Sequence, residues 1–319
     1  MFLKRCEFAI HRFGGSILSL NLSECSKSIP SRISNALGDH CTALRWLSLR
    51  GVESLQGISL VRIAQRNPQL RWLNVSGCFN VNPTTLSQVA EALPGLTHLM
   101  AHHCQLGIPS FQTIAGSFKA LKMLRLNNNL STTYATTQLV SNMAELEFLD
   151  LSHTGLRDDN MMRLLASAPK IRTLILSHCD FLEGDLFGFL PKLVHLEALD
   201  ISHCVNLGSY TINALGSIPS LQKLDISWCT SVEEEDLESL VGILAANHSL
   251  LKNFWFQGTR IGSRAFDELQ ALECLERPLD PSSCRYLTRE QRRLPAGELP
   301  LRGQLIALPP PFAITVETQ

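Results

Sequence analysis

The hydrophobic positions of this chain recur in a fixed phrase. The phrase L-x-x-L-x-L-x-x-C is read at Leu70–Cys78 and again at Leu96–Cys104, with apolar residues at positions 1, 4 and 6 and a small residue at position 9. We number these positions 1 to 9 throughout. Because a fixed period of this kind decides a fold more firmly than local propensity does, the repeat is interpreted first.

Copies of the phrase run through most of the chain in one register. They begin 25 to 30 residues apart, at Ile17, Leu44, Leu70, Leu96, Leu121, Leu146, Ile171, Leu196, Leu221 and Leu251. Position 9 is cysteine in most copies and asparagine at Asn129. A buried cysteine suits this place because it is small and its weak S–H donor can meet a loop carbonyl, as an asparagine amide would. This many matches in one register are not chance.

Each copy predicts one strand followed by one helix. The apolar run around Leu99 forms a short strand, and neighbouring copies supply its missing hydrogen bonds at a spacing of ~4.8 Å. The remainder of each copy carries apolar residues at helical spacing, as in 84–93, 159–168 and 233–244. The acidic run that begins at Glu233 is interpreted as a helix start, where the macrodipole favours carboxylates. The sequence therefore predicts an α/β fold, a right-handed solenoid with a parallel sheet on its concave face and helices on its convex face.

The repeat defines three segments. Residues 1–16 are expected to cap the first copy, residues 17–275 form the repeat domain, and residues 276–319 form a proline-containing tail. The tail has basic residues such as Arg292 and Arg293, which are opposite in charge to acidic residues of the later copies. We therefore consider two alternatives for the tail, one that folds back across the acidic part of the concave face and one that is disordered.

These residues resemble the cysteine-containing subclass of leucine-rich repeats, which is best known from F-box/leucine-rich-repeat proteins. The period of about 25 and the continuation after the cysteine, as in Cys78-Phe-Asn-Val-Asn and Cys229-Thr-Ser-Val-Glu, carry the resemblance over roughly residues 17–272. The resemblance implies a substrate receptor of a cullin-RING ubiquitin ligase. An F-box is not found in the sixteen residues before Ile17. An adaptor and a cullin are therefore expected as partners only if a longer isoform supplies that module.

The charge composition argues against two classes of partner, nucleic acids and membranes. The chain has 319 residues, with Lys+Arg 28 against Asp+Glu 29 and a formal net charge of −1, so we expect neither nucleic acid nor a membrane as the main partner. The N-terminal residues lack the continuous apolar centre of a secretory signal. Cytoplasmic or nuclear localisation is expected, with a mitochondrial presequence as the alternative.

The motifs give no support for catalysis. The sequence has no G-x-S-x-G, no phosphate-binding loop and no H-E-x-x-H, so we expect no enzyme activity, no catalytic residues and no cofactor. The tripeptide Ser-His-Cys recurs at Ser177–Cys179 and Ser202–Cys204, and histidine and cysteine are side chains that bind metal ions. A metal site is not expected there, because the cysteine points into the core and the histidine out of it.

The concave face is the predicted binding surface, since positions 3 and 5 of each copy project from it. A stripe of aromatic residues and methionine is the expected anchor for a protein partner, and charged residues are expected to orient it. The candidate partner-binding residues are Trp46, Trp72, His98, Met100, Met123, Arg125, Phe148, Asp150, Asp200 and Asp225. The alternative is that these aromatic residues pack on one another only to cover the sheet.

Two functions follow from this reading. The first is a non-enzymatic interaction scaffold, a substrate-recognition type module of a ubiquitin-ligase-like system that binds a protein on its concave face. The second is a structural subunit of a larger stable assembly, in which the aromatic stripe and the tail are buried against neighbouring proteins. A solenoid specifies a binding platform, so the sequence does not identify the partner.

Overall fold

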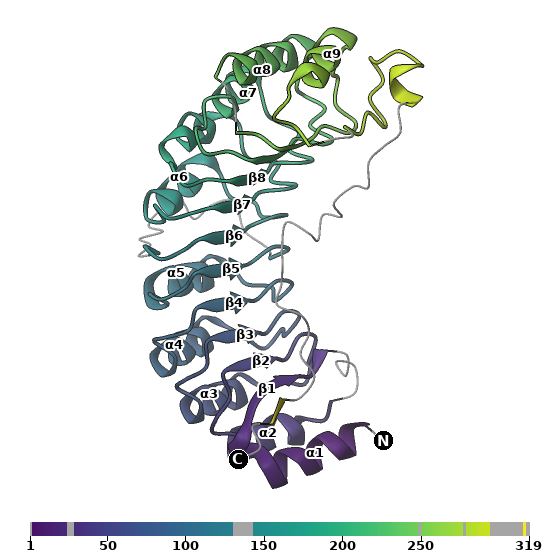
Figure 1. Ribbon diagram of the computed structural model, residues 1–319. Coiled ribbons are helices and arrows are strands. Elements are labelled where there is room, and N and C mark those ends of the chain that lie inside the picture. Colours follow the sequence, from purple (N-terminus) through teal and green to yellow (C-terminus); the bar gives the residue numbers. More distant parts are fainter. Residues whose placement is uncertain are drawn as a thin grey trace. The chain divides into compact units, whose positions relative to one another are not determined.

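The protein is described from a computed structural model. It describes residues 2–23, 29–129, 143–247, 250–276, 279–293 and 315–316. These residues fall into two compact units, the first comprising 1–146 with 308–319 and the second 147–307. Each unit is a stack of strand-and-helix coils, as in a leucine-rich-repeat solenoid (Figure 1). The predicted α/β repeat fold is therefore confirmed.

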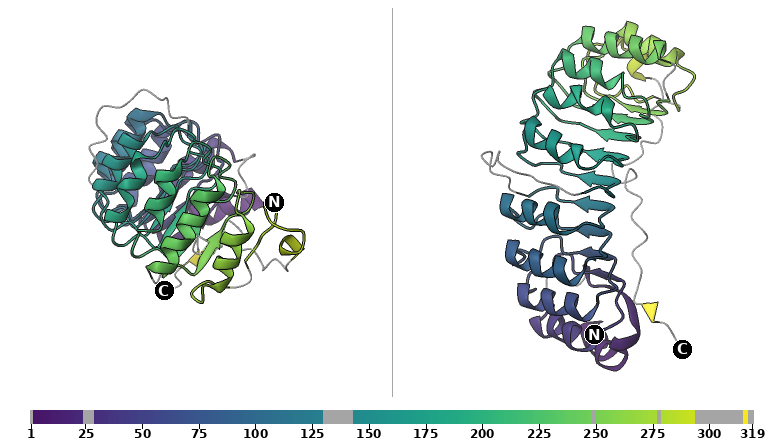
Figure 2. Two further views of the ribbon diagram at one scale, coloured as in Figure 1. Left: turned by 90° about the horizontal axis from the view of Figure 1, so that it is seen from above. Right: turned by 90° about the vertical axis from the view of Figure 1, so that its left-hand side faces the viewer.

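The first unit has parallel strands with helices on one side (Figure 2). Its strands are β1 (Ile17–Asn21), β2 (Trp46–Ser48), β3 (Trp72–Asn74), β4 (His98–Met100) and β5 (Met123–Arg125). Its helices are α1 (Phe2–Phe13), α2 (Ser31–His40), α3 (Gly57–Arg66), α4 (Pro83–Ala92) and α5 (Ile108–Ser117), with the 3₁₀ turn η1 (Gly14–Ser16). Equivalent positions of neighbouring strands are paired in register, so that Trp46 lies opposite Trp72 and Trp72 lies opposite His98.

The second unit repeats this plan. Its strands are β6 (Phe148–Asp150), β7 (Thr173–Ile175), β8 (Ala198–Asp200), β9 (Lys223–Asp225) and β10 (Asn253–Trp255). Its helices are α6 (Asp158–Ala166), α7 (Ser209–Leu215), α8 (Glu234–Ala246) and α9 (Ser263–Ala271), with the 3₁₀ segments η3 (Asp185–Gly188), η4 (Leu190–Lys192) and η5 (Gln291–Arg293). Between β7 and β8, two 3₁₀ segments stand where the repeat predicts an α-helix. Gly184, Gly188 and Pro191 explain the difference, because glycine and proline disfavour an α-helix interior.

The core of each coil is built from positions 1, 4 and 6. Leu70, Leu73 and Val75 are at most 1% exposed, and the equivalent Leu221, Leu224 and Ile226 are at most 3% exposed. Position 4 is the middle residue of each three-residue strand, so its side chain points to the helix side while positions 3 and 5 point away from it.

Where position 9 is cysteine or asparagine in the described coils, its side chain joins the coil to the one before it. The Sγ–H of Cys78 donates to the carbonyl of Leu49 at 3.2 Å, and that of Cys204 donates to Leu176 at 3.2 Å. Asn129 makes the same bond through its amide to Ala101 at 2.8 Å. The predicted role of this position is therefore confirmed. Burial raises the pKa of the Cys78 thiol to about 12, so at neutral pH it is the protonated donor.

Position 8 has a left-handed backbone in successive coils. The φ angle is +72° at Gly77, +57° at His178, +59° at His203 and +63° at Trp228. A non-glycine residue pays a steric cost in this region, because its Cβ approaches the following carbonyl oxygen. The turn that leads out of each strand therefore accepts glycine readily and other residues only under strain.

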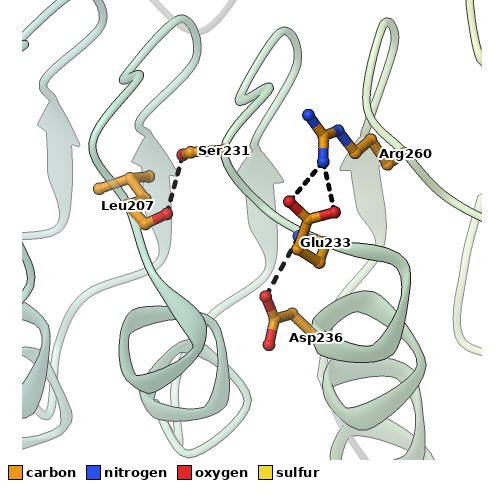
Figure 3. A network of polar contacts seen from close by, with 5 residues as sticks. All are labelled: Leu207, Ser231, Glu233, Asp236 and Arg260. Carbon is orange, nitrogen blue, oxygen red and sulfur yellow. Dashed lines mark hydrogen bonds and ion pairs between the residues drawn. The ribbon is translucent and has the colours of Figure 1, made fainter.

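The acidic run at residues 233–236 starts α8, as predicted (Figure 3). The backbone N–H of Glu233 donates to Asp236 at 3.1 Å as half of a capping box. The Glu233 carboxylate also forms an ion pair with Arg260 of the next coil, and Ser231 donates to the carbonyl of Leu207 at 2.8 Å. Acidic residues here satisfy the exposed N–H groups at the helix start and join neighbouring coils.

The coil geometry recurs after residue 275. The N–H of Glu276 donates to Lys252 at 2.7 Å, Cys284 donates through Sγ to Phe256 at 3.4 Å, and Ser283 has a φ of +63°. These are the ladder, position 9 and position 8 features of the phrase. We interpret residues 276–293, apart from 277–278 outside the described residues, as a further coil. Its signal is weak in the sequence for two reasons. The backbone bonds place the buried Leu275 at position 1 and Glu276 at position 2, so the phrase that ends at Cys284 is one residue longer than in the other copies, and Pro281 stands where position 6 has an apolar residue.

Helix α1 and strand β11 (Thr315–Val316) both belong to the first unit, although they are far apart in the sequence. Helix α1 packs on α2 and buries Cys6 and Ile10. The short strand β11 pairs antiparallel with β1, with Thr315 opposite Ser19. Residues 294–314 lie outside the described residues, so the hypothesis that the tail crosses the acidic part of the concave face remains untested.

Because the buried cysteines donate hydrogen bonds between coils, we expect replacement of a buried cysteine to destabilise the protein more than replacement of an exposed one. Replacing Cys229, which donates to Ile201 at 3.1 Å and is fully buried, with alanine removes the donor and lowers the free energy of unfolding by about 1–3 kcal/mol. Replacing the exposed Cys274 with alanine is the matched control and changes it by less than about 0.5 kcal/mol. Urea unfolding followed by circular dichroism measures both. Equal stabilities of the two variants would contradict the structural role of position 9.

At the left-handed turn we expect a glycine variant to be more stable than an alanine variant, which is the reverse of their usual order in helices and strands. His178→Gly and His178→Ala both remove the ring, but only alanine keeps a Cβ at a φ of +57°. We therefore expect the glycine variant to be more stable than the alanine variant by about 1 kcal/mol in thermal unfolding. An alanine variant that is as stable as the glycine variant would show that this turn is not strained.

Candidate functional site

The candidate site lies on the sheet face that points away from the helices, which we call the outer face. Positions 3 and 5 of each coil supply it, as do the position 7 side chains beside them. This is the face on which the sequence placed the candidate residues. The outer faces of the two units are described separately.

A pair of stacked indoles forms the centre of the first unit's outer face. Trp46 of β2 and Trp72 of β3 occupy position 3 of neighbouring coils, and their ring centroids lie 4.1 Å apart with an interplanar angle of 14°. Trp72 is only 8% exposed, whereas Trp46 is half-buried. The stack follows directly from the register, because Trp46 and Trp72 are paired across the ladder.

The other candidates of this unit continue the same rows. His98 follows Trp72 at position 3, and its Nδ1 lies 2.8 Å from Thr97 Oγ1. Met123 follows His98, and both are half-buried. At position 5, Met100 is 2% exposed and is paired with Arg125, which is half-buried. The structure thus brings all six candidates of the first unit together on one face.

Several buried polar atoms on this face have no hydrogen-bond partner. They are Ser19 Oγ, Trp46 Nε1, Trp72 Nε1, His102 Nδ1 and Asn127 Oδ1. Each such atom costs about 1–3 kcal/mol relative to a paired one. A ligand that offers matching groups recovers this free energy, so the face is chemically incomplete on its own.

Position 7 contributes residues that the sequence analysis did not select. His102 and Asn127 occupy this position in neighbouring coils, and Arg50 occupies it two coils before His102. Burial is the main cause that lowers the pKa of His102 to about 4, and the charges of Arg50 and Arg125 lower it further. His102 is therefore neutral at pH 7. The sequence did contain a signal for these residues, because position 7 is polar in every copy of the first unit. Positions 3 and 5 alone do not include it.

The acidic candidates of the second unit have a structural partner. Asp150, Asp200 and Asp225 are 3%, 6% and 6% exposed. One carboxylate oxygen of each accepts the backbone N–H of the residue two positions later, at 3.1, 2.9 and 2.8 Å. Asn74 makes the same contact with Ser76 at 2.9 Å. These acids close the turn after the strand, the local bond that Asp and Asn favour. Phe148, also of this unit, is 8% exposed at position 3 of β6.

Histidines at position 8 of the second unit form a column of rings. His153, His178 and His203 stack with centroid distances of 4.1 and 4.2 Å, and Trp228 follows at 5.9 Å. The equivalent position in the next coil is Gly258, where a Cβ would meet the Trp228 ring at 2.5 Å. Within the described part of the chain, no three His, Cys, Asp or Glu side chains converge as metal ligands.

Comparisons with known proteins support the fold. No protein-family model matches the chain, and no curated protein matches it. A chain of the crystal structure of the Rad7 and Elc1 complex in yeast is similar, with a TM-score of 0.55 and 20% sequence identity over 89% of this chain and 81% of that chain. A likeness at this identity shows a shared repeat fold.

The structure also bears on membrane insertion. In the residues described here, no helix has both the length and the apolar character that are needed to cross a bilayer.

The buried acids generate a test that separates turn closure from partner contact. Asp200→Asn keeps the accepting oxygen, as Asn74 does, and is expected to change stability by less than about 0.5 kcal/mol, whereas Asp200→Ala loses about 1 kcal/mol or more. Chemical denaturation measures the difference. If Asp200→Asn were as destabilising as Asp200→Ala, the carboxylate charge and not the turn bond would be what the fold needs.

Proposed function

We propose that this protein is a non-enzymatic interaction module that binds a segment of another protein on the outer face of its first unit. The observation that carries the proposal is the stacked pair of Trp46 and Trp72, whose indole N–H groups are buried and have no partner. Tryptophan is enriched among the residues that dominate binding energy at protein interfaces. The alternative, in which the rings only cover the sheet, does not account for two donors left without acceptors.

Rigidity favours this use of the surface. The position 3 and position 5 residues of the outer face lie on strands of three to five residues that are hydrogen-bonded to their neighbours in the first unit's sheet. A partner that binds such a surface meets side chains already held in place, so less conformational entropy is lost on binding. A solenoid offers this kind of extended platform.

The finer assignment is a substrate-recognition type module of a ubiquitin-ligase-like system. The resemblance of the repeat to F-box/leucine-rich-repeat proteins supports it, as does the likeness to a chain that was crystallised as a complex of Rad7 and Elc1. An adaptor and a cullin belong to this proposal only where a longer form of the chain supplies an F-box. We also propose that the protein works in the cytoplasm or nucleus.

Affinity purification from the protein's own cells tests the module. The double variant Trp46→Ala/Trp72→Ala is expected to lose at least about tenfold of a bound protein that wild type retains, as quantified by mass spectrometry. The control variant Ile58→Ala/Phe79→Ala removes exposed apolar side chains of the same unit, 74% and 50% exposed, and retains the partner. Circular dichroism checks that both variants are folded.

Two outcomes decide between the functions. Recovery of an adaptor and a cullin with wild type supports the receptor assignment, and proteins lost only from the tryptophan variant are its candidate substrates. Recovery of one fixed set of subunits that is unaffected by either variant supports the structural-subunit alternative and contradicts the chosen face.

A further inference from the structure

The unpaired polar atoms of the first unit's outer face include both donors and acceptors. The indole Nε1–H groups of Trp46 and Trp72 only donate, whereas Asn127 Oδ1 only accepts. His102 Nδ1 is also without a partner, and a neutral imidazole offers one nitrogen as an acceptor. Ser19 Oγ on β1 is in the same condition on this face. Among the described residues, the other buried side-chain polar atoms without a partner belong to Ser34, Asn160 and Thr211, which lie on helices. The condition is thus concentrated on one face.

An extended peptide backbone has the complementary pattern. Its carbonyl and N–H groups alternate along the chain, and neither is used internally in an extended conformation. The indoles of Trp46 and Trp72 belong to adjacent strands, which lie ~4.8 Å apart. Carbonyl groups of a segment that crosses the strands can accept from the indole pair, while its N–H groups can donate to Asn127.

The charge of the same face selects the side chains of such a segment. At positions 3, 5 and 7 of the described coils of the first unit there is no carboxylate, and the cations there are Arg50 and Arg125. The same positions in the coils of β6 to β10 of the second unit hold three carboxylates, Asp150, Asp200 and Asp225, and one cation, Lys223, so their net charge is negative. The net charge of −1 for the whole chain conceals this separation.

We propose that the outer face of the first unit binds an extended, acidic peptide segment of the partner protein. The backbone of the segment pairs with Trp46, Trp72 and Asn127, and its carboxylates lie against Arg50 and Arg125. This inference rests on the proposed function and specifies the chemistry of the partner at that site.

The geometry disfavours single-stranded nucleic acid as the occupant, although aromatic and basic residues often bind it together. Nucleic acids use aromatic rings by stacking bases on an open ring face. Here the two indoles stack on each other at 4.1 Å, and Trp72 is only 8% exposed. What these indoles lack is a hydrogen-bond acceptor for each N–H group.

Fluorescence anisotropy with the purified full chain tests the inference. The probe is a labelled peptide of alternating glutamate and serine, and the comparison probes are an alternating lysine and serine peptide and a single-stranded oligothymidylate. We expect the acidic peptide to bind and to weaken as salt is added. Arg50→Ala and Arg125→Ala are each expected to weaken binding about tenfold, and Trp72→Phe, which keeps a ring but removes the N–H, about fivefold.

Lys223→Ala is the matched control, because Lys223 is a cation on the outer face of the second unit. It is expected to leave the affinity within about twofold of wild type. Thermal unfolding of every variant separates lost binding from lost folding. An affinity for the acidic peptide that is indifferent to Arg50→Ala, Arg125→Ala and Trp72→Phe overturns the inference.

The remaining outcomes also decide. Tighter binding of the lysine peptide or of the oligothymidylate, or light scattering that shows copies of the chain associating through Arg50, gives the face a different occupant and overturns the inference. If the acidic peptide does not bind but tryptophan-dependent capture of a partner persists, the acidic chemistry is wrong and the proposed function stands. If that capture also fails, the proposed function fails with it.

Discussion

The fold depends on one constraint, which is that each coil must satisfy the hydrogen-bonding groups of the coil beside it. Three-residue strands are too short to be stable alone, so their backbone groups need a neighbour in register. Position 9 adds a side-chain bond to the same requirement, through Cys78, Cys104 or Cys229 to a carbonyl of the preceding coil. A slip of one residue would break both sets of bonds and expose the core side chains.

The same constraint arranges the surface into columns. Because the register is kept within each unit, equivalent positions of successive coils come into contact. Trp46 therefore stacks on Trp72, and His153, His178 and His203 stack on one another. The same columns collect Arg50 and Arg125 on the outer face of the first unit and Asp150, Asp200 and Asp225 on that of the second. Residues that act together in such a protein stand at equivalent positions of successive coils and are not adjacent in the sequence.

Sequence reasoning reached the repeat, its register and the role of position 9, because each depends on residue types that recur at a fixed spacing. It did not predict the further coil after residue 275, where the phrase is one residue longer and Pro281 stands at position 6, while the backbone bond from Glu276 to Lys252 persists. Nor did it show that Asp150, Asp200 and Asp225 close turns, since a buried capping carboxylate and a partner-facing one look alike in sequence. The unpaired indole N–H groups depend on atomic positions and were not readable from the pattern.

The central claim is that the outer face of the first unit recognises an extended acidic segment. Selection of a random peptide library displayed on phage against the purified chain tests it most directly, with counter-selection against the Trp72→Phe variant. The account predicts that enriched peptides share acidic residues at alternating positions and lose binding to that variant. Enrichment of basic or purely apolar peptides, or of acidic peptides that bind Trp72→Phe equally well, would contradict it.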